Sequence, residues 1–392
     1  MGQRLKIRIK VTSPNMLFFI VSMFLMTVMT IINGNQYVAG LAFVWVPSSI
    51  LLLSSLLVKK ENMLCGHNLL VLLLAGLAVY STYSNPGIAS ESNCLNLVFC
   101  CISYIFVSSV VLKNDDFTHI IRLYALFGFI IGAWLLLNSI FSIGVRVFSA
   151  GNVRVSITYF GILKDVNYLS AFIVPAFTIY FYKGCFQGRL KHLIMAGIIF
   201  VGVFFGGSRS CFIAMILAVV IIVSKYLLNS EVKNKGMIII ALVLVSSVLF
   251  FVMMNSTIFE RTTDFANYGD NTRLIIWNYA MEGFYQNPIF GSGTSSGTYY
   301  SQLHVRWVTH SCFVDLITAQ GIIGCIIIFL LFLRLFRVNK SNKIFMLSVF
   351  ITFFLPLFFI DGYVCATFWM PMTLCRLISK KALESENILE ML

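Results

Sequence analysis

Two arginines and one histidine are the side chains of this sequence whose types and surroundings are best suited to chemistry. Arg273 and His310 lie in a polar region, residues 255–324, that separates two apolar runs, and Arg209 lies in an earlier Ser-Arg-Ser triplet. A guanidinium group binds phosphate or carboxylate through two parallel hydrogen bonds, which the ammonium group of lysine cannot do. A neutral imidazole can take a proton from a hydroxyl group. These residue types predict an anion-binding site beside a general base.

The rest of the chain has the composition of a membrane protein. Of its 392 residues, 59% are hydrophobic and 11% are charged, whereas a soluble domain is about 25% charged. Continuous apolar runs of about twenty residues suit membrane-crossing helices and lack the period-two alternation of a barrel. We therefore predict an all-α integral membrane protein that forms one polytopic domain over residues 1–392. The predicted transmembrane helices, about twelve in number, are 15–33, 38–58, 68–83, 95–112, 119–142, 167–182, 192–207, 211–228, 237–254, 309–335, 344–360 and 364–379.

The distribution of charge predicts the orientation of these spans. The net charge is +13, and lysine and arginine of a bilayer protein gather in its cytoplasmic loops. Twelve spans with both termini in the cytoplasm place most basic residues inside, so nucleic acid is not an expected partner. The basic residues that remain on the outer side are Arg146, Arg154, Lys164, Arg209, Arg261, Arg273 and Arg306.

These outward cations are nearly all arginines, which indicates an anion-binding surface at the outer boundary of the membrane. A structural alternative stays open, because some of these arginines could simply form ion pairs with outward acidic residues. The acidic residues concerned are Glu91, Asp165, Glu260, Asp264, Asp270, Glu282 and Asp361.

The large extracytoplasmic loop between the ninth and tenth spans, residues 255–308, is the predicted catalytic segment. Residues 271–286 carry apolar side chains at three-to-four spacing and predict a short amphipathic helix in the membrane interface, with Arg273 in its first turn. Asn287-Pro288 should end that helix, and the glycines that follow allow tight turns and close backbone approach. The alternatives are a packing helix with a snorkelling arginine, and a His310 that only caps the next helix.

Other patterns set limits on the chemistry. A charged residue in mid-membrane is costly, so Arg209 predicts a break between the spans 192–207 and 211–228. The ten cysteines show no metal-ligand spacing and are interpreted as small core residues, so no metal and no cofactor are expected. A Ser-His-Asp hydrolase is disfavoured, because Ser311 and Asp315 flank His310 on one helix.

Three segments together resemble the bacterial O-antigen ligase and Wzy-type polysaccharide polymerase superfamily. They are GGSRS (206–210), TRLIIWNYAMEGFYQNPIFGSG (272–293) and HSCFVDLITAQGIIG (310–324). The family shows Ser-Arg near an outer helix end, R-x-x-x-W before N-P-x-x-G-x-G, and H-N/S-x-x-x-D/E before G-x-x-G. This chain has Ser311 where many members have asparagine.

The resemblance implies a metal-independent, GT-C-like membrane glycosyltransferase that needs no cofactor. Its donor would be a glycan on undecaprenyl diphosphate at the outer leaflet of the bacterial cytoplasmic membrane. Arg209 and Arg273 match the family's essential arginines and would clamp the diphosphate, and His310 would activate the acceptor hydroxyl. The residues of the variable loops are candidate substrate-binding helpers only: Arg146, Arg154, Lys164, Arg261 and Arg306.

The acceptor distinguishes the members of this superfamily. A polymerase adds the glycan to another lipid-linked repeat unit, and a ligase adds it to the lipid A core. The GSRS form and the compact stretch before His310 favour the polymerase, with a chain-length regulator as a further candidate partner. A transporter of the same lipid-linked oligosaccharide is the alternative from another class, although the chain lacks an obvious internal repeat.

Overall fold

The computed structural model describes residues 13–33, 42–61, 63–141, 145–149, 152–159, 162–228, 270–360 and 362–391. These residues are mainly helical, as predicted. The longer helices are α1 (Pro14–Asn33), α2 (Ala42–Leu56), α3 (Gly66–Tyr83), α4 (Glu91–Ser108), α5 (Asn114–Phe141), α6 (Val166–Gln187), α7 (Leu190–Gly206), α8 (Arg209–Leu228), α11 (Asp270–Ala280), α12 (Glu282–Gln286), α13 (Ser296–Val305), α14 (Cys312–Leu335), α15 (Lys343–Phe354) and α16 (Ala366–Glu384). Short 3-10 turns are η1 (Lys340–Asn342), η2 (Pro356–Phe359) and η3 (Ile388–Glu390).

Seven helical stretches within the described residues are long and apolar enough to cross a membrane. They are Gly66–Tyr83, Glu91–Ser108, Asn114–Asn138, Val166–Gln187, Arg209–Leu228, Cys312–Leu335 and Lys340–Phe359. A helix also covers each other predicted span except 237–254, which lies outside the described residues. Some of these helices fall short of the roughly twenty residues that a span needs: α2 has 15 residues and α7 has 17. The predicted total of twelve spans is therefore supported only in part.

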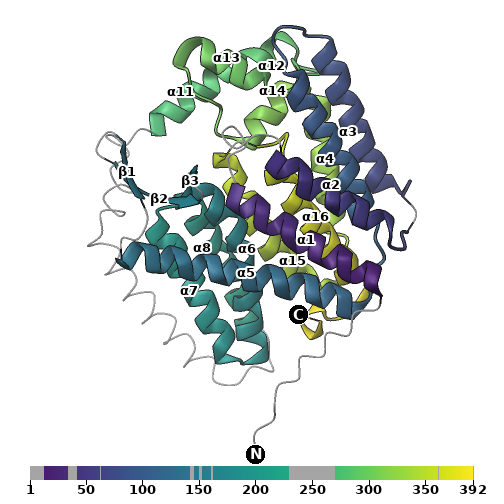
Figure 1. Ribbon diagram of the computed structural model, residues 1–392, viewed down its shortest axis with the longest axis vertical. Coiled ribbons are helices and arrows are strands. Elements are labelled where there is room, and N and C mark those ends of the chain that lie inside the picture. Colours follow the sequence, from purple (N-terminus) through teal and green to yellow (C-terminus); the bar gives the residue numbers. More distant parts are fainter. Residues whose placement is uncertain are drawn as a thin grey trace, which may run out of the picture.

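Helix α6 is the centre of one half of the bundle. It packs against α5, α7, α8 and α15, and nearly all of its side chains are buried. An apolar helix without a polar face is buried on all sides in this way. In the other half, α3 packs against α4 and α14, and α16 packs against α4 (Figure 1).

The predicted break before Arg209 is present. Helix α7 ends at Gly206, and Gly207 adopts a left-handed conformation with φ of 80° that lets the chain turn. Helix α8 then begins at Arg209 itself, so this charged side chain lies at a helix end. The break therefore removes the cost of holding the guanidinium in the middle of one long span.

A small antiparallel sheet corrects the expectation of a purely helical fold. Its strands are β1 (Val145–Ser149), β2 (Asn152–Tyr159) and β3 (Ile162–Asp165), in the order β1-β2-β3. Valine and isoleucine alternate with other residues through this stretch, which is the period that favours strands. Figure 1 shows the sheet at the side of the molecule, beyond the ends of α5 and α8.

The predicted catalytic loop is helical where it is described. Residues 255–269 lie outside the described residues, and the rest contains α11, α12 and α13, the last two joined by the non-helical stretch 287–295. The helical conformation expected over 271–286 is present as two consecutive helices that end at Gln286, immediately before Asn287-Pro288, while the interfacial position expected for this segment stays a prediction. Figure 1 shows these helices together at one end of the molecule, beside the start of α14. We refer to α11, α12 and α13 as the helical cap.

Candidate active site at the start of α14

Helix α14 is interrupted close to its start. Gly321 has φ of 60° and ψ of −159°, so the regular helical hydrogen bonds fail around it. The stretch 288–293 supplies replacements: the amides of Ser292 and Gly293 donate to the carbonyls of Thr318 (2.9 Å) and Ala319 (3.0 Å). The amides of residues 322 and 323 donate in turn to the carbonyls of residues 288 and 289, at 2.9 and 3.2 Å. Unpaired backbone groups in an apolar environment cost several kcal/mol, so this seam stabilises the broken helix.

Glycines make the seam possible, as the sequence predicted. Gly291 and Gly293 have φ of 78° and 90°, in the left-handed region. A Cβ atom on Gly291 would lie 2.3 Å from the carbonyl carbon and oxygen of Ala319, and one on Gly293 would lie 2.5 Å from the Cβ atom of Ala89. The backbone of 288–293 therefore approaches α14 more closely than any residue with a side chain would allow. Two of the segments quoted for the resemblance are joined here.

Arg273 extends from the first turn of α11 to the end of η2. Its guanidinium carbon lies 5.4 Å from the ring centroid of Phe359, and the residue is half-buried. Contact between a guanidinium group and the face of an aromatic ring favours a defined orientation of the arginine side chain. The next carbonyl, that of Ile360, accepts a hydrogen bond of 2.8 Å from the amide of Cys312 at the start of α14. Arg273 is therefore located where α14 begins.

His310 lies at the same place. It directly precedes Ser311, whose hydroxyl caps α14 by accepting from the amide of Val314 at 3.3 Å. The half-buried His310 has φ of 50°, a left-handed conformation that is uncommon outside glycine. Ser311 performs the capping, so a capping role does not account for His310.

Hydrogen bonds hold the backbone on the N-terminal side of His310. The indole Nε1 of Trp277 donates to the carbonyl of Thr309 at 2.8 Å, and the hydroxyl of Thr309 donates to Oδ1 of Asp315 at 2.6 Å. Trp277 is one helical turn after Arg273 on α11, so the same helix contributes the arginine and fixes the segment that carries the histidine. The spacing R-x-x-x-W therefore places the arginine and the tryptophan on the same side of α11.

Arg209 is the first residue of α8, and this end of α8 lies near the end of α15 and the turn η2. The ammonium group of Lys225, in the last turn of α8, donates to the carbonyl of Ser341 at 2.6 Å, just before α15. Since α8 and α15 pack together, they run antiparallel, and α8 starts near the end of α15. The following turn, η2, also contacts α8 and ends at the Phe359 ring that Arg273 covers. The three predicted catalytic residues thus belong to helix ends that meet around η2.

The structure describes four of the five predicted helper residues. Arg146 pairs with Val155 across β1 and β2, Arg154 pairs with Val147, and Lys164 of β3 pairs with Ile157. Arg261 lies outside the described residues. Arg306 is exposed at the end of α13, in a left-handed conformation with φ of 57°.

The other histidine of this region has a structural explanation. His304 stacks on Tyr279 at 4.2 Å between ring centroids, and its Nε2 lies 3.3 Å from a carboxylate oxygen of Glu282. The hydroxyl of Tyr300 donates to Gln286 at 2.6 Å, and burial raises the pKa of Tyr300, so it stays a neutral donor. These contacts hold the three cap helices together.

Across the described part of the chain, no group of three or more His, Cys, Asp or Glu side chains could hold a metal ion.

Replacing Trp277 by phenylalanine is expected to lower activity several-fold, because the Thr309 carbonyl loses a donor while the ring volume is largely kept. A hydrogen bond of this kind contributes about 1 kcal/mol. Transfer kinetics of the purified variant, with its thermal unfolding in detergent, would measure the effect. Trp134→Phe on α5 is the matched control, since that indole nitrogen finds no acceptor among the described residues. Equal effects of the two substitutions would show that the Trp277 bond does not position the site.

The apolar helices define the protein as a polytopic membrane protein of the helical class. Residues 194–329 match the family model described as O-antigen ligase, and this segment contains Arg209, Arg273 and His310. The match confirms the resemblance to the O-antigen ligase and polymerase superfamily over that part of the chain. No curated protein and no solved structure matches the chain.

The structure adds residues that sequence reasoning had not assigned to the site. Phe359 gave no signal, since it is one of many phenylalanines in an apolar run far along the chain from Arg273. Thr309 is only the first residue of the predicted span 309–335. Thr309 precedes Asp315 by six residues, across the turn where α14 begins. This spacing is the sequence signal that could have identified Thr309 as a hydrogen-bond partner of Asp315.

Proposed function

We propose that this protein is a polysaccharide polymerase of the O-antigen or capsule type. It transfers a glycan from undecaprenyl diphosphate to a lipid-linked repeat unit at the outer leaflet of the bacterial cytoplasmic membrane. The observation that carries the proposal is the convergence of Arg273 and His310 at the start of α14 through Phe359, Ile360 and Cys312. The family match over residues 194–329 supports the same class of membrane glycosyltransferase.

In this proposal the arginines bind the leaving group. Arg273 and Arg209 contact the diphosphate of the donor, and their charge stabilises the negative charge that develops as the bond from the sugar C1 to the phosphate oxygen breaks. The electron pair of that bond leaves with undecaprenyl diphosphate. Contact with the Phe359 ring restricts the position of the Arg273 side chain beforehand, which lowers the cost of ordering it.

His310 is the proposed general base. It takes the proton of the acceptor hydroxyl as the hydroxyl oxygen forms its bond to C1 of the donor sugar. The imidazolium then releases this proton to water or to the departing diphosphate, and the site returns to its starting state. Arg146, Arg154, Lys164, Arg261 and Arg306 are proposed as helpers that extend the positive surface toward the rest of the substrate, and a chain-length regulator as a protein partner.

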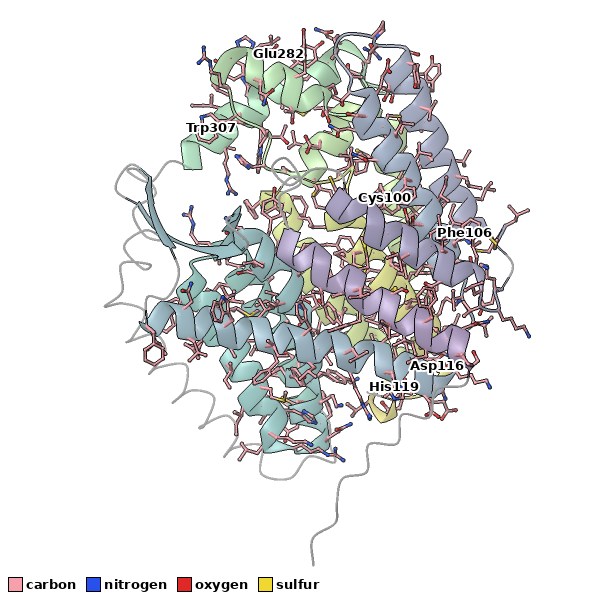
Figure 2. The ribbon with its side chains drawn as sticks, in the orientation of Figure 1. Cys100, Phe106, Asp116, His119, Glu282 and Trp307 are labelled. Atoms are coloured by element: carbon pink, nitrogen blue, oxygen red, sulfur yellow. The ribbon has the colours of Figure 1, made fainter. Side chains whose placement is uncertain are left out.

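The proposed orientation places the helical cap on the extracytoplasmic side of the membrane and both termini in the cytoplasm. Figure 2 shows Glu282 and Trp307 of the cap region at one end of the molecule and Asp116 and His119 of α5 toward the other. Lysines gather at the second end, where Lys380 lies 3.0 Å from Glu61 and its ammonium group also donates to the carbonyls of Ser108 and Val110. Such a gathering of lysines supports a cytoplasmic position.

A ligase is the second candidate, because the family model that matches the chain carries the description O-antigen ligase. Its chemistry at Arg273 and His310 would be the same, and only the acceptor would be the lipid A core. A transporter of the lipid-linked oligosaccharide would not need a base at His310.

Surface polysaccharide on gels from cells that lack the gene separates these functions. Wild type is expected to restore a ladder of chain lengths, and Arg273→Ala and His310→Ala to leave a single repeat unit on the acceptor. Mutants that accumulate long chains on undecaprenyl diphosphate beside bare lipid A core would establish the ligase instead. Mutants with a normal ladder would refute the assignment of both residues.

A further inference from the structure

The segment 306–311 between α13 and α14 has a fixed backbone. The hydroxyl of Ser301 donates to the carbonyl of Trp307 at 2.7 Å, and the indole of Trp277 donates to the carbonyl of Thr309 at 2.8 Å. Ser301, Thr309 and Ser311 are buried. Hydrogen bonds to its carbonyls at two positions, together with these buried side chains, leave such a segment few alternative conformations.

Two rings of the same segment face outward from this fixed backbone. The Trp307 side chain is 58% exposed and His310 is half-buried. Their ring centroids lie 6.4 Å apart with an angle of 46° between the planes. The backbone is left-handed at Arg306, directly before Trp307, with φ of 57°, and at His310 itself, with φ of 50°. Left-handed backbone costs a non-glycine residue about 1 kcal/mol, so the fold maintains this arrangement at a cost.

An exposed indole next to a proposed base suits a sugar ring. One face of a pyranose carries several C–H groups, and these slightly positive hydrogens pack on the negative face of an aromatic ring. A sugar that lies on Trp307 would bring its hydroxyl groups to the neighbouring His310. The diphosphate of the donor is assigned to the arginines around η2, so the sugar on Trp307 is the acceptor.

We infer that Trp307 forms the acceptor subsite, as a platform that holds the terminal sugar of the acceptor glycan against His310. The inference rests on the proposed function and deepens it, since it names the residue that selects and orients the acceptor. Trp307 is a substrate-binding residue in this account and takes no part in proton transfer. Figure 2 places Trp307 beside α11, the helix that carries Arg273.

Tryptophan also anchors proteins in the lipid headgroup region, and this role would expose the ring equally well. Leu303 in the last part of α13, four residues before Trp307, is also an exposed apolar side chain and is compatible with such contact. The two roles predict different effects of replacing Trp307 by leucine. Leucine restores an apolar contact with lipid but has no aromatic face for a sugar.

The test measures transfer by the purified full chain in nanodiscs from a labelled undecaprenyl diphosphate-linked repeat unit to a soluble repeat-unit glycoside. Trp307→Leu and Trp307→Ala are both expected to raise the KM for the glycoside about 10-fold, with the KM for the lipid-linked donor unchanged. Trp307→Phe is expected to recover most of the loss. Tyr285→Ala is the matched control, because this α12 side chain is 69% exposed and makes no contact with the segment 306–311 in any described interaction.

Recovery of the acceptor KM by leucine, or an increase only in the donor KM, would overturn the acceptor subsite. Both results leave the proposed function standing, because transfer still occurs. The absence of transfer by the wild type to any acceptor would instead overturn the proposed function and the subsite together.

Discussion

Arg273→Lys is expected to lower the rate constant of glycan transfer at least about 100-fold, although the positive charge is kept. Removing one preorganised donor from a site of developing charge costs about 100- to 1,000-fold in other enzymes. Lysine offers no planar pair of donors to a phosphate and cannot stack on Phe359 as the guanidinium does. Single-turnover kinetics with saturating lipid-linked donor measure the effect directly.

Arg337→Lys provides the control for this substitution. Arg337 is exposed beyond the C-terminal end of α14, at the opposite end of that helix from His310. We expect its replacement to leave transfer unchanged. A lysine at position 273 that supports normal transfer would show that Arg273 acts only as a snorkelling interfacial charge, the alternative that the sequence left open.

Gly291→Ala is expected to prevent the cap from packing on α14 and to yield little folded protein. The new Cβ atom would lie 2.3 Å from the carbonyl of Ala319, and the φ of 78° is unfavourable for alanine. Relief of the overlap requires the backbones of 288–293 and 318–323 to separate, which breaks their hydrogen bonds in an apolar environment. The yield of monodisperse protein and its unfolding temperature in detergent report the outcome.

Gly76→Ala on α3 is the matched control for that experiment. Its Cβ atom would meet no other atom within 4 Å, so the substitution is expected to be neutral or slightly stabilising through helix propensity. A Gly291→Ala protein as stable as the wild type would mean that the seam across the break in α14 does not hold the cap in place.

Local signals in the sequence predicted several helix ends correctly. The charge of Arg209 indicated the break between α7 and α8, and Asn287-Pro288 indicated the end of the helix over 271–286. These are effects of neighbouring residues on the backbone, so they are readable without knowledge of the fold. The position of His310 at the start of α14 followed in the same way from the beginning of an apolar run.

Long-range contacts were beyond such reasoning. The sequence showed that the glycines of 287–300 permit close approach, but not that their partner would be the interrupted turn at Gly321. Likewise it marked Arg273 and Trp277 without showing that the first stacks on Phe359 and the second donates to Thr309. Each pairing depends on how α11 and α14 pack, and no local pattern encodes that.

The sheet was missed for a different reason. The alternation of valine and isoleucine through β1 and β2 is a local signal, and it was available in the sequence. The arginines of this stretch alternate with β-branched residues, so the same positions carry both a charge signal and the period-two signal of a strand, and only the second reports the sheet. The predicted number of twelve spans is supported only in part, because some apolar helices are shorter than a membrane crossing requires. Hydropathy alone does not distinguish a helix that crosses the membrane from a shorter apolar helix.

The measurement that tests the central claim most directly is glycan transfer by the purified chain in nanodiscs, with one defined undecaprenyl diphosphate-linked repeat unit as both donor and acceptor. The account predicts release of undecaprenyl diphosphate together with lipid-linked dimers and longer chains, and the loss of both products in His310→Ala while Arg337→Lys retains them. A folded wild-type protein that releases no undecaprenyl diphosphate, or a His310→Ala protein that makes chains at the normal rate, would contradict it.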